Sequence, residues 1–149
     1  MRIPEPFFAI LNPTLSILLR SPFHRLVSKS LMLISVVGRK SGKTYSIPVR
    51  YIRHRDTIRF FTGATNKWWR NMRDGADVTL LVEGKNDGYH AVAVESPPDR
   101  IREALVLLFK EFPQDAPYYE VRIDKSGHPL PQDLDRAAQN TVMIEARKT

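Results

Sequence analysis

The stretch that decides the fold is residues 30–62, SLMLISVVGRKSGKTYSIPVRYIRHRDTIRFFT. Residues 30–37 are mostly apolar and are followed by a glycine, which predicts a short strand that is buried on both faces. Residues 46–54 alternate apolar and polar side chains, and residues 57–62 are rich in β-forming residues. Because only two residues separate these last two segments, the stretch predicts three consecutive strands that end in a tight hairpin.

Strands continue in the second half of the chain. Residues 77–83 and 88–95 predict a second hairpin, and residues 141–146 predict a final strand. Pro48 falls inside one of the earlier strands, and we expect it at an edge or a bulge because proline cannot donate a ladder hydrogen bond. Five or six antiparallel strands with few helices predict a mainly β fold, a small barrel with helices at its rim.

Helices are expected around these strands. Residues 4–20 carry apolar side chains three and four positions apart, which predicts an amphipathic helix that packs on the protein or touches lipid. Residues 96–112 predict a second helix, with Ser96 as its N-cap and Pro97 at its first helical position. Residues 114–140 are rich in Pro, Asp and Gly and predict a long loop that holds one short helix.

Length and composition narrow the class of protein. The 149 residues fit one domain, residues 1–149, and the absence of cysteine excludes disulfides, a zinc–thiolate site and a cysteine nucleophile. No apolar run reaches the roughly 18 residues that span a bilayer, so we expect a cytoplasmic protein that meets membranes, if at all, through its first helix. Residues 1–74 hold 14 Lys or Arg against three acidic residues, which indicates an anionic partner.

The segment Gly38-Arg39-Lys40-Ser41-Gly42-Lys43-Thr44 lies between two predicted strands. Its glycines allow a tight turn that exposes backbone N–H groups, and its cations and hydroxyls can bind phosphate oxygens. It is not a Walker loop, which requires four residues between its first glycine and its Gly-Lys-Ser/Thr group. Taken alone, the segment is equally explained as a solvated basic turn, and both readings stay open.

The segment from Gly63 to Met72 begins with loop-forming residues and continues into a predicted helix. Its adjacent tryptophans, Trp68 and Trp69, would point about 100° apart on a helix. Either one enters the core while the other lines a cleft, or both serve structural packing, and the two interpretations stay open. The four histidines have no metal-ligand spacing, and no nucleophile motif is present, so neither a metal site nor a hydrolase is expected.

Four pieces of the chain, taken together, resemble the deazaflavin-dependent nitroreductase family within the flavin/deazaflavin oxidoreductases. They are Gly38–Gly42, Ile47–Val49, Trp68–Met72 and Val78–Val82, and their order and spacing match the family. The similarity begins in the N-terminal segment and runs at least to Arg100. The resemblance implies a split β-barrel of the FMN-binding type that holds coenzyme F420, with FMN as the alternative cofactor.

The resemblance also implies roles for particular residues. Contacts with the anionic tail or phosphate of the cofactor fall to Arg39, Lys40, Ser41 and Gly42. The strand around Pro48 lies along the ring, and backbone groups of Ile47 and Val49 are candidates for bonds to the ring edge. Further cofactor contacts are expected from Thr62, Gly63, Ala64, Thr65, Asn66, Lys67, Trp68 and Asn71. Tyr118 and Tyr119 are candidates for the substrate pocket.

The function predicted in this way is hydride transfer from reduced F420 to a quinone, an activated alkene or a nitro compound. Because the cofactor carries the chemistry, no obligatory catalytic side chain is required. An FMN-binding oxidoreductase, and a non-enzymatic carrier of a cofactor or lipophilic ligand, are the alternatives. The expected partners are a small-molecule hydride acceptor and a second copy of the chain, and nucleic acid is not expected because no recognised binding module accompanies the charge.

Overall fold

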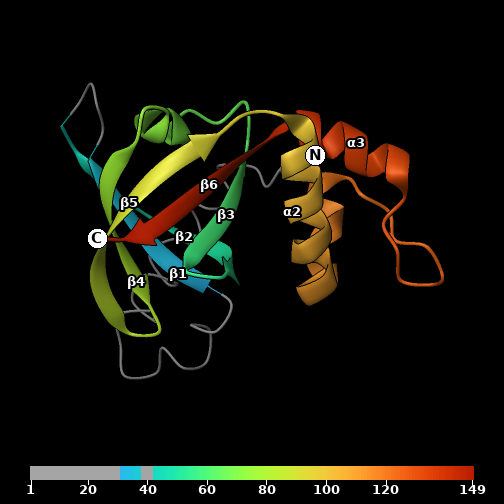
Figure 1. Cartoon of the computed structure of the whole chain (residues 1–149), viewed down its shortest axis with the longest axis horizontal. Helices are drawn as coiled ribbons and strands as arrows, with labels where there is room; N and C mark the ends of the chain where they lie inside the picture. Colours follow the sequence, from blue (N-terminus) through green and yellow to red (C-terminus); the bar gives the residue numbers. More distant parts are fainter. Residues whose placement is uncertain (1–30, 38–41) are drawn as a thin grey trace.

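The computed structural model describes residues 31–37 and 42–149. Two predictions lie outside the described residues, namely the helix over residues 4–20 and the cofactor contacts of Arg39, Lys40 and Ser41. Six strands form a barrel at one side of the molecule, and two α-helices lie at the other side (Figure 1).

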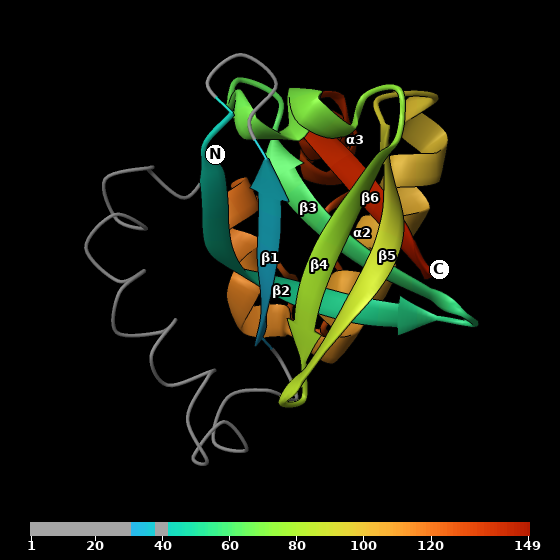
Figure 2. The same cartoon turned by 90° about the vertical axis from the view of Figure 1, so that its left-hand side faces the viewer.

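The strands of the barrel are β1 (Leu31–Val37), β2 (Thr44–His54), β3 (Thr57–Gly63), β4 (Ala76–Val82), β5 (Lys85–Val94) and β6 (Thr141–Lys148). They close in the order β1-β2-β3-β6-β5-β4, and all paired neighbours are antiparallel. Figure 2 shows the barrel with the helices behind it. The prediction of a mainly β protein built as an antiparallel barrel is confirmed.

Alternate residues of each strand fill the interior of the barrel. Phe60, Leu80 and Ile144 have no exposed surface, and they belong to one apolar cluster to which all six strands contribute. Burying a side chain of this size stabilises the fold by about 1.5–3 kcal/mol. Met32 and Leu33 point to opposite faces of β1 and are both buried, as the apolar run of this strand predicts.

Strand β2 is paired unevenly. Its residues from Thr44 to Arg50 pair with β1, whereas β3 pairs only with Tyr51 to His54. Pro48 therefore lies where β1 is the single partner of β2 among the described strands. A proline is tolerated there because it has no N–H to donate. The prediction that Pro48 occupies an edge position is confirmed, and the edge is local to one half of the strand.

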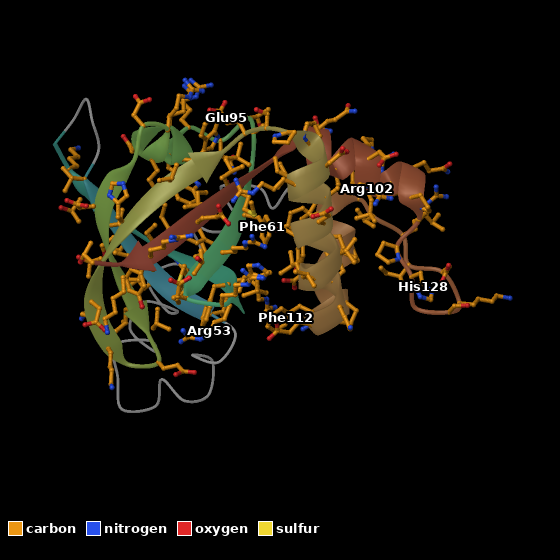
Figure 3. All side chains as sticks on the ribbon, viewed as in Figure 1. Arg53, Phe61, Glu95, Arg102, Phe112 and His128 are labelled. Carbon is orange, nitrogen blue, oxygen red and sulfur yellow. The ribbon has the colours of Figure 1, made fainter. Side chains whose placement is uncertain are left out.

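Helical segments cover the outer face of the barrel on one side. They are α2 (Pro98–Glu111), the 3-10 helix η3 (Pro113–Tyr119) and α3 (Pro131–Gln139). Leu105 and Leu108 of α2 share a buried apolar cluster with Phe61 and Met143, which project outward from the barrel. Figure 3 shows Phe61 between β3 and α2. This second core attaches the helices to strands β3 and β6.

Helix α2 begins one residue later than the sequence predicts. Pro97 is its N-cap, Pro98 is its first residue, and no side chain caps it. Steric contact with a following proline drives a residue out of the α region, so Pro97 remains extended with a ψ of 156°. The assignment of Ser96 as N-cap and Pro97 as first helical residue is therefore wrong.

Residues 114–140 are more helical than a single long loop. Helices η3 and α3 occupy most of the stretch, and a bridge between Ile123 and Pro129 closes the segment that joins them. Ala116 and Leu134 are buried in the same apolar cluster as α2. Tertiary burial thus orders a segment whose Pro, Asp and Gly content indicates a loop.

Candidate cofactor site

One end of the barrel gathers most of the described residues that the sequence assigns to a cofactor. Strand β1 ends at Val37, β2 begins at Thr44 and β3 ends at Gly63, and these three points share one end because β1 and β3 both run antiparallel to β2. The 3-10 helix η2 (Trp68–Met72) follows β3 at the same end, as Figure 2 shows. We call this part of the molecule, residues 42–44 and 63–75, the η2 end.

The loop between β3 and η2 is held by its own hydrogen bonds. Asn66 donates from Nδ2 to the buried Thr62 hydroxyl at 2.8 Å, and its backbone N–H donates to the Gly63 carbonyl at 3.0 Å. The Ala64 N–H donates to the Asn140 carbonyl at 2.8 Å, which ties the loop to the residue that precedes β6. Thr65, between these anchors, is exposed. The conformation of the loop is therefore fixed by the protein itself.

The two tryptophans differ in burial, although both contact the apolar core of the barrel. Trp69 is 3% exposed and donates from its indole N–H to the Ala64 carbonyl at 3.2 Å. Trp68 is half-buried, and its ring is parallel to that of Phe60 with centroids 6.3 Å apart. Asn71 donates from Nδ2 to the Trp68 carbonyl at 2.8 Å. Helix η2 has only five residues, so it is shorter than the predicted helix and carries little macrodipole.

Exposed cations at the η2 end fit an anionic ligand. Lys43 lies just before β2, while Lys67 and Arg70 lie at the start of η2 and within it. Asp74 is the single acidic residue in residues 42–44 and 63–75. Gly42 has a φ of +69°, a backbone conformation that glycine adopts without strain. The described residues therefore provide a turn and a positive charge that suit phosphate or carboxylate groups.

The register of β2 identifies which backbone groups are left at its unpaired edge. His54 and Thr57 flank the two-residue turn, so the backbone N–H and C=O of His54 point toward β3. The same groups of every second residue of β2 before His54 point to that side as well. By this alternation Ser46 and Pro48 face the side of β2 where β3 is unpaired, and Ile47 and Val49 face β1. The hairpin between β4 and β5 gives a second check. Starting from its two-residue turn, the same alternation can be followed through β4 and β1 to β2, and it leads to the same assignment.

Several of these groups escape prediction from the sequence motifs. Lys43 lies in the basic segment from Gly38 to Thr44, and Arg70 lies within the Trp68–Met72 piece, but the resemblance assigns neither of them a cofactor contact. Their sequence signal is the excess of positive charge in the first half of the chain. The exposed backbone groups of Ser46 carry no sequence signal, because only the pairing of the strands reveals them.

The two candidate pocket tyrosines lie on η3, apart from the η2 end. Tyr118 is 43% exposed, and Tyr119 packs edge-on against Phe109 with ring centroids 5.4 Å apart. Burial raises the pKa of the Tyr119 hydroxyl above its usual value, and the nearby Asp115 carboxylate raises it further, so Tyr119 stays protonated. The structure thus places these tyrosines beside α2.

Metal and membrane features receive no support from the described part of the chain. Within residues 31–37 and 42–149, no group of three or more His, Asp or Glu side chains could hold a metal ion. No helix in the same residues is long and apolar enough to cross a membrane.

A closed antiparallel barrel in which one half of β2 has a single described strand partner is the architecture of a split β-barrel. Residues 22–133 match the model of the F420H(2)-dependent quinone reductase family, and the chain belongs to this family. It is therefore an oxidoreductase that uses coenzyme F420, and the resemblance seen in its motifs is confirmed. No curated protein sequence matches the chain significantly.

Solved structures support the fold. A chain described as a domain-swapped dimer is 16% identical, with a TM-score of 0.53, and the match covers 94% of this chain and 98% of that one. The F420-H2 dependent reductase FDR-A is 18% identical, with a TM-score of 0.50, and covers 78% and 94%. Protein Atu2129, of unknown function, from Agrobacterium tumefaciens str. C58 is 18% identical, with a TM-score of 0.52, but the match spans 80% of this chain and only 48% of Atu2129.

Proposed function

We propose that this enzyme reduces a quinone, an activated alkene or a nitro compound, with F420 held between the η2 end and the unpaired edge of β2. The description of the family favours a quinone as the acceptor. The single observation that carries the placement is the uneven pairing of β2, which leaves residues 44–50 without a second described strand partner.

The unpaired edge of β2 offers the groups that a flavin-type ring can bind. Ser46 presents an N–H and a C=O there, and Pro48 presents a C=O alone because proline has no N–H. A ring edge that carries both donors and acceptors can replace the missing strand at these groups. Ile47 and Val49 then act by fixing the strand, since their side chains pack in or against the interior of the barrel.

The anionic part of the cofactor is proposed to lie over the turn and η2. Gly42 with the preceding Arg39, Lys40 and Ser41 would surround the phosphate. Lys67 and the other exposed cations of the η2 end would neutralise the remaining charge. The loop residues from Thr62 to Asn66, with Trp68 and Asn71, would support this side, because their own hydrogen bonds keep them in place.

Reduced F420, when bound, would supply a hydride, which carries the electron pair that the acceptor takes up, and a proton from solvent would complete the reduction. The task of the chain is to orient the ring, expose one face to the acceptor and exclude water. Half-buried Trp68, stacked on Phe60, gives the η2 end a rigid apolar surface for this purpose. Tyr118, which is exposed on η3, stays a candidate for contact with the acceptor.

F420 fluorescence during titration with the purified chain tests the binding site. We expect Lys67→Gln to weaken binding about threefold, since one exposed cation near an anion contributes less than about 1 kcal/mol. Lys85→Gln is the matched control, because Lys85 is also exposed but begins β5, next to the turn at the opposite end of the barrel. Equal losses in both variants, or no binding of F420 by the unaltered chain, would contradict the placement.

Steady-state oxidation of reduced F420 tests the acceptor. Menadione, cyclohexenone and a nitrofuran represent the three acceptor classes, and we expect the highest kcat/KM with menadione. If fluorescence recovers at the same rate with and without an acceptor, the chain binds F420 but does not pass its hydride to that acceptor. Tyr118→Phe should change the KM for the acceptor and leave F420 affinity unaltered if this tyrosine contacts the acceptor.

Self-association and location are also proposed. We infer that two copies of the chain form a dimer in the cytoplasm, and that the segment over residues 4–20 provides any membrane contact. Light scattering after size exclusion measures the first property, and a single-chain mass at micromolar concentration would refute it. Sedimentation with anionic vesicles measures the second, with a chain that starts at residue 21 as control.

A further inference from the structure

A hollow of about 600 Å³ is lined by η3, by α3 and by the segment that joins them. Figure 1 shows α3 on the side of α2 that faces away from the barrel. The lining of the hollow includes Pro113, Pro117, Val121, Ile123, Arg122 and Arg136. None of these residues belongs to the η2 end. The hollow is therefore independent of the proposed cofactor site.

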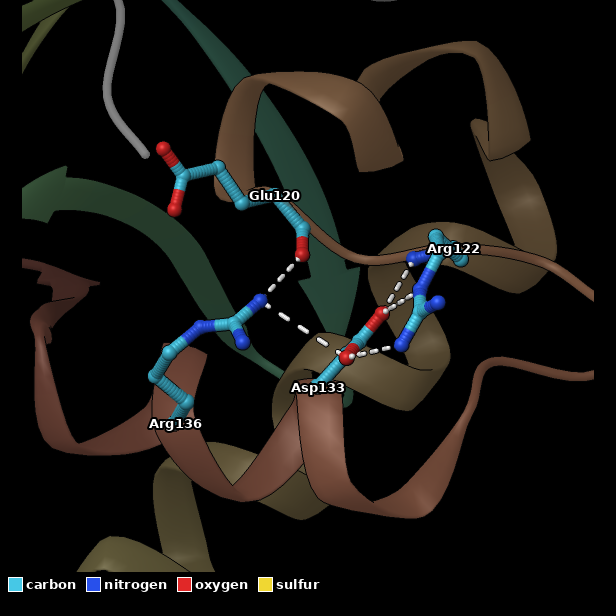
Figure 4. A network of polar contacts seen from close by, with 4 residues as sticks. All are labelled: Glu120, Arg122, Asp133 and Arg136. Atoms are coloured by element: carbon cyan, nitrogen blue, oxygen red, sulfur yellow. Dashed lines mark hydrogen bonds and ion pairs between the residues drawn. The ribbon is translucent and has the colours of Figure 1, made fainter.

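A buried carboxylate orients the two arginines of this hollow. Asp133 accepts from the backbone N–H and Nε of Arg122, both at 2.9 Å, and from its Nη2 at 3.2 Å. Nη2 of Arg136 lies 3.7 Å from the same carboxylate and donates to the Glu120 carbonyl at 2.6 Å. Figure 4 shows both guanidinium groups converging on Asp133. Their positions are thus set before any ligand arrives.

The arrangement presents positive charge outward. The Asp133 side chain is 2% exposed, whereas those of Arg122 and Arg136 are 68% and 49% exposed. An incoming molecule therefore meets guanidinium groups before it meets the carboxylate. Two cations share one buried anion, and Nη1 of each arginine takes part in no hydrogen bond within the described residues. Glu120 also borders the hollow, but its carboxylate points away from both guanidinium groups (Figure 4), so donors remain beside the arginines for one further carboxylate.

The rest of the lining is apolar. Val121 is buried, Ile123 is half-buried, and Pro113 and Pro117 add ring surface without N–H donors. A surface of this kind takes up the hydrocarbon part of a ligand, while the arginines bind its head group. We propose that the hollow is a second binding site, selective for small monocarboxylates that have an apolar body.

Benzoate and its neutral analogue benzamide are the probes for this site. Amide NMR signals of the full-length chain, followed during titration with each, report where and how tightly they bind. We expect benzoate to shift the signals of Val121 and Ile123, and benzamide to bind about tenfold more weakly, because it lacks the charge that strengthens hydrogen bonds from guanidinium groups. Equal affinities, or shifts confined to other parts of the chain, would overturn the proposal.

Arg136→Gln is expected to raise the benzoate Kd at least fivefold. Arg102→Gln is the control, since Arg102 bonds to Asp135 on the same pair of helices but does not line the hollow. An unchanged Kd in Arg136→Gln would refute the site. If the Tm of Arg136→Gln is lowered, Arg136→Lys is tested in its place, because lysine keeps the positive charge. Independently of any variant, the ratio of the benzoate and benzamide Kd values on the unaltered chain tests the proposal. F420 fluorescence is expected to respond to none of these changes.

Discussion

The ion pair between Arg50 and Asp115 is expected to hold β2 and η3 together. Arg50 donates from Nε and Nη2 to the two carboxylate oxygens of Asp115, at 2.7 and 3.0 Å. Its guanidinium carbon also lies 4.4 Å from the centre of the Phe112 ring. Asp115→Asn removes the negative charge and leaves the shape of the side chain nearly unchanged. The variant therefore removes the charge together with one of the two hydrogen bonds, because an amide nitrogen cannot accept from the guanidinium.

The size of the effect follows from burial. Removing one partner of a fully buried pair costs about 3–5 kcal/mol, whereas exposed pairs contribute about 0–1 kcal/mol. The Asp115 side chain is 11% exposed and that of Arg50 is 26% exposed, so the pair lies nearer the buried limit. We expect Asp115→Asn to lower the free energy of unfolding by about 2–3 kcal/mol. For a chain of this length the corresponding fall in Tm is about 5–10 °C.

Urea unfolding followed by tryptophan fluorescence measures this loss. Asp135→Asn is the matched control, because Asp135 pairs with Arg102 at the same 2.7 Å but is 63% exposed. We expect the control to lose less than about 0.5 kcal/mol. A loss in Asp115→Asn no larger than in Asp135→Asn would refute the reasoning. A double-mutant cycle with Arg50→Met should give a coupling energy above about 1.5 kcal/mol.

Three further changes have expected outcomes. Thr141→Val should stabilise the chain by about 1 kcal/mol in urea unfolding, because the buried Thr141 hydroxyl has no hydrogen-bond partner among residues 31–37 and 42–149, and a loss of stability would contradict this. Hydrogen bonds from Arg122 lower the pKa of Asp133 to about 2. The stabilisation that the ionised carboxylate gives is therefore complete above about pH 4 and is lost as the pH falls toward 2. We expect the free energy of unfolding to depend less on pH between 6 and 2 in Asp133→Asn than in the unaltered chain. Gly75→Ala should lower the free energy of unfolding by more than the roughly 1 kcal/mol expected for Gly42→Ala. Both glycines have a positive φ, but only at Gly75 would a new Cβ meet the His90 ring, at 2.7 Å. Equal melting temperatures of the two variants would exclude that clash.

Strand positions were accessible from the sequence because they depend on local periodicity. The alternation of residues 46–54 and the apolar run of residues 30–37 reflect faces that the barrel buries. The stretch 114–140 was not accessible in the same way. The one short helix predicted there is confirmed as α3, whereas η3 depends on burial of Ala116 against α2, a contact that no periodicity within residues 114–140 encodes.

The residues of the candidate site were also predictable from the sequence only in part. Motif order identified the family, which the family match confirms. It also singled out the turn, the tryptophan pair and the strand around Pro48, whose cofactor contacts stay predictions. The motif could not show that Ser46 and Pro48, rather than Ile47 and Val49, point their backbone groups to the unpaired edge. Register decides this, because a shift of one residue along a strand reverses every backbone direction.

By itself the sequence determined a barrel-forming set of strands, a positively charged first half and a family of F420-dependent enzymes. Only the tertiary structure decided where β2 loses its second partner, and how Asp133 gathers Arg122 and Arg136 around a hollow lined by η3 and α3. The physical reason is that periodicity and charge are properties of neighbouring residues in the chain. Unpaired edges and buried ion pairs arise when segments far apart in sequence come together.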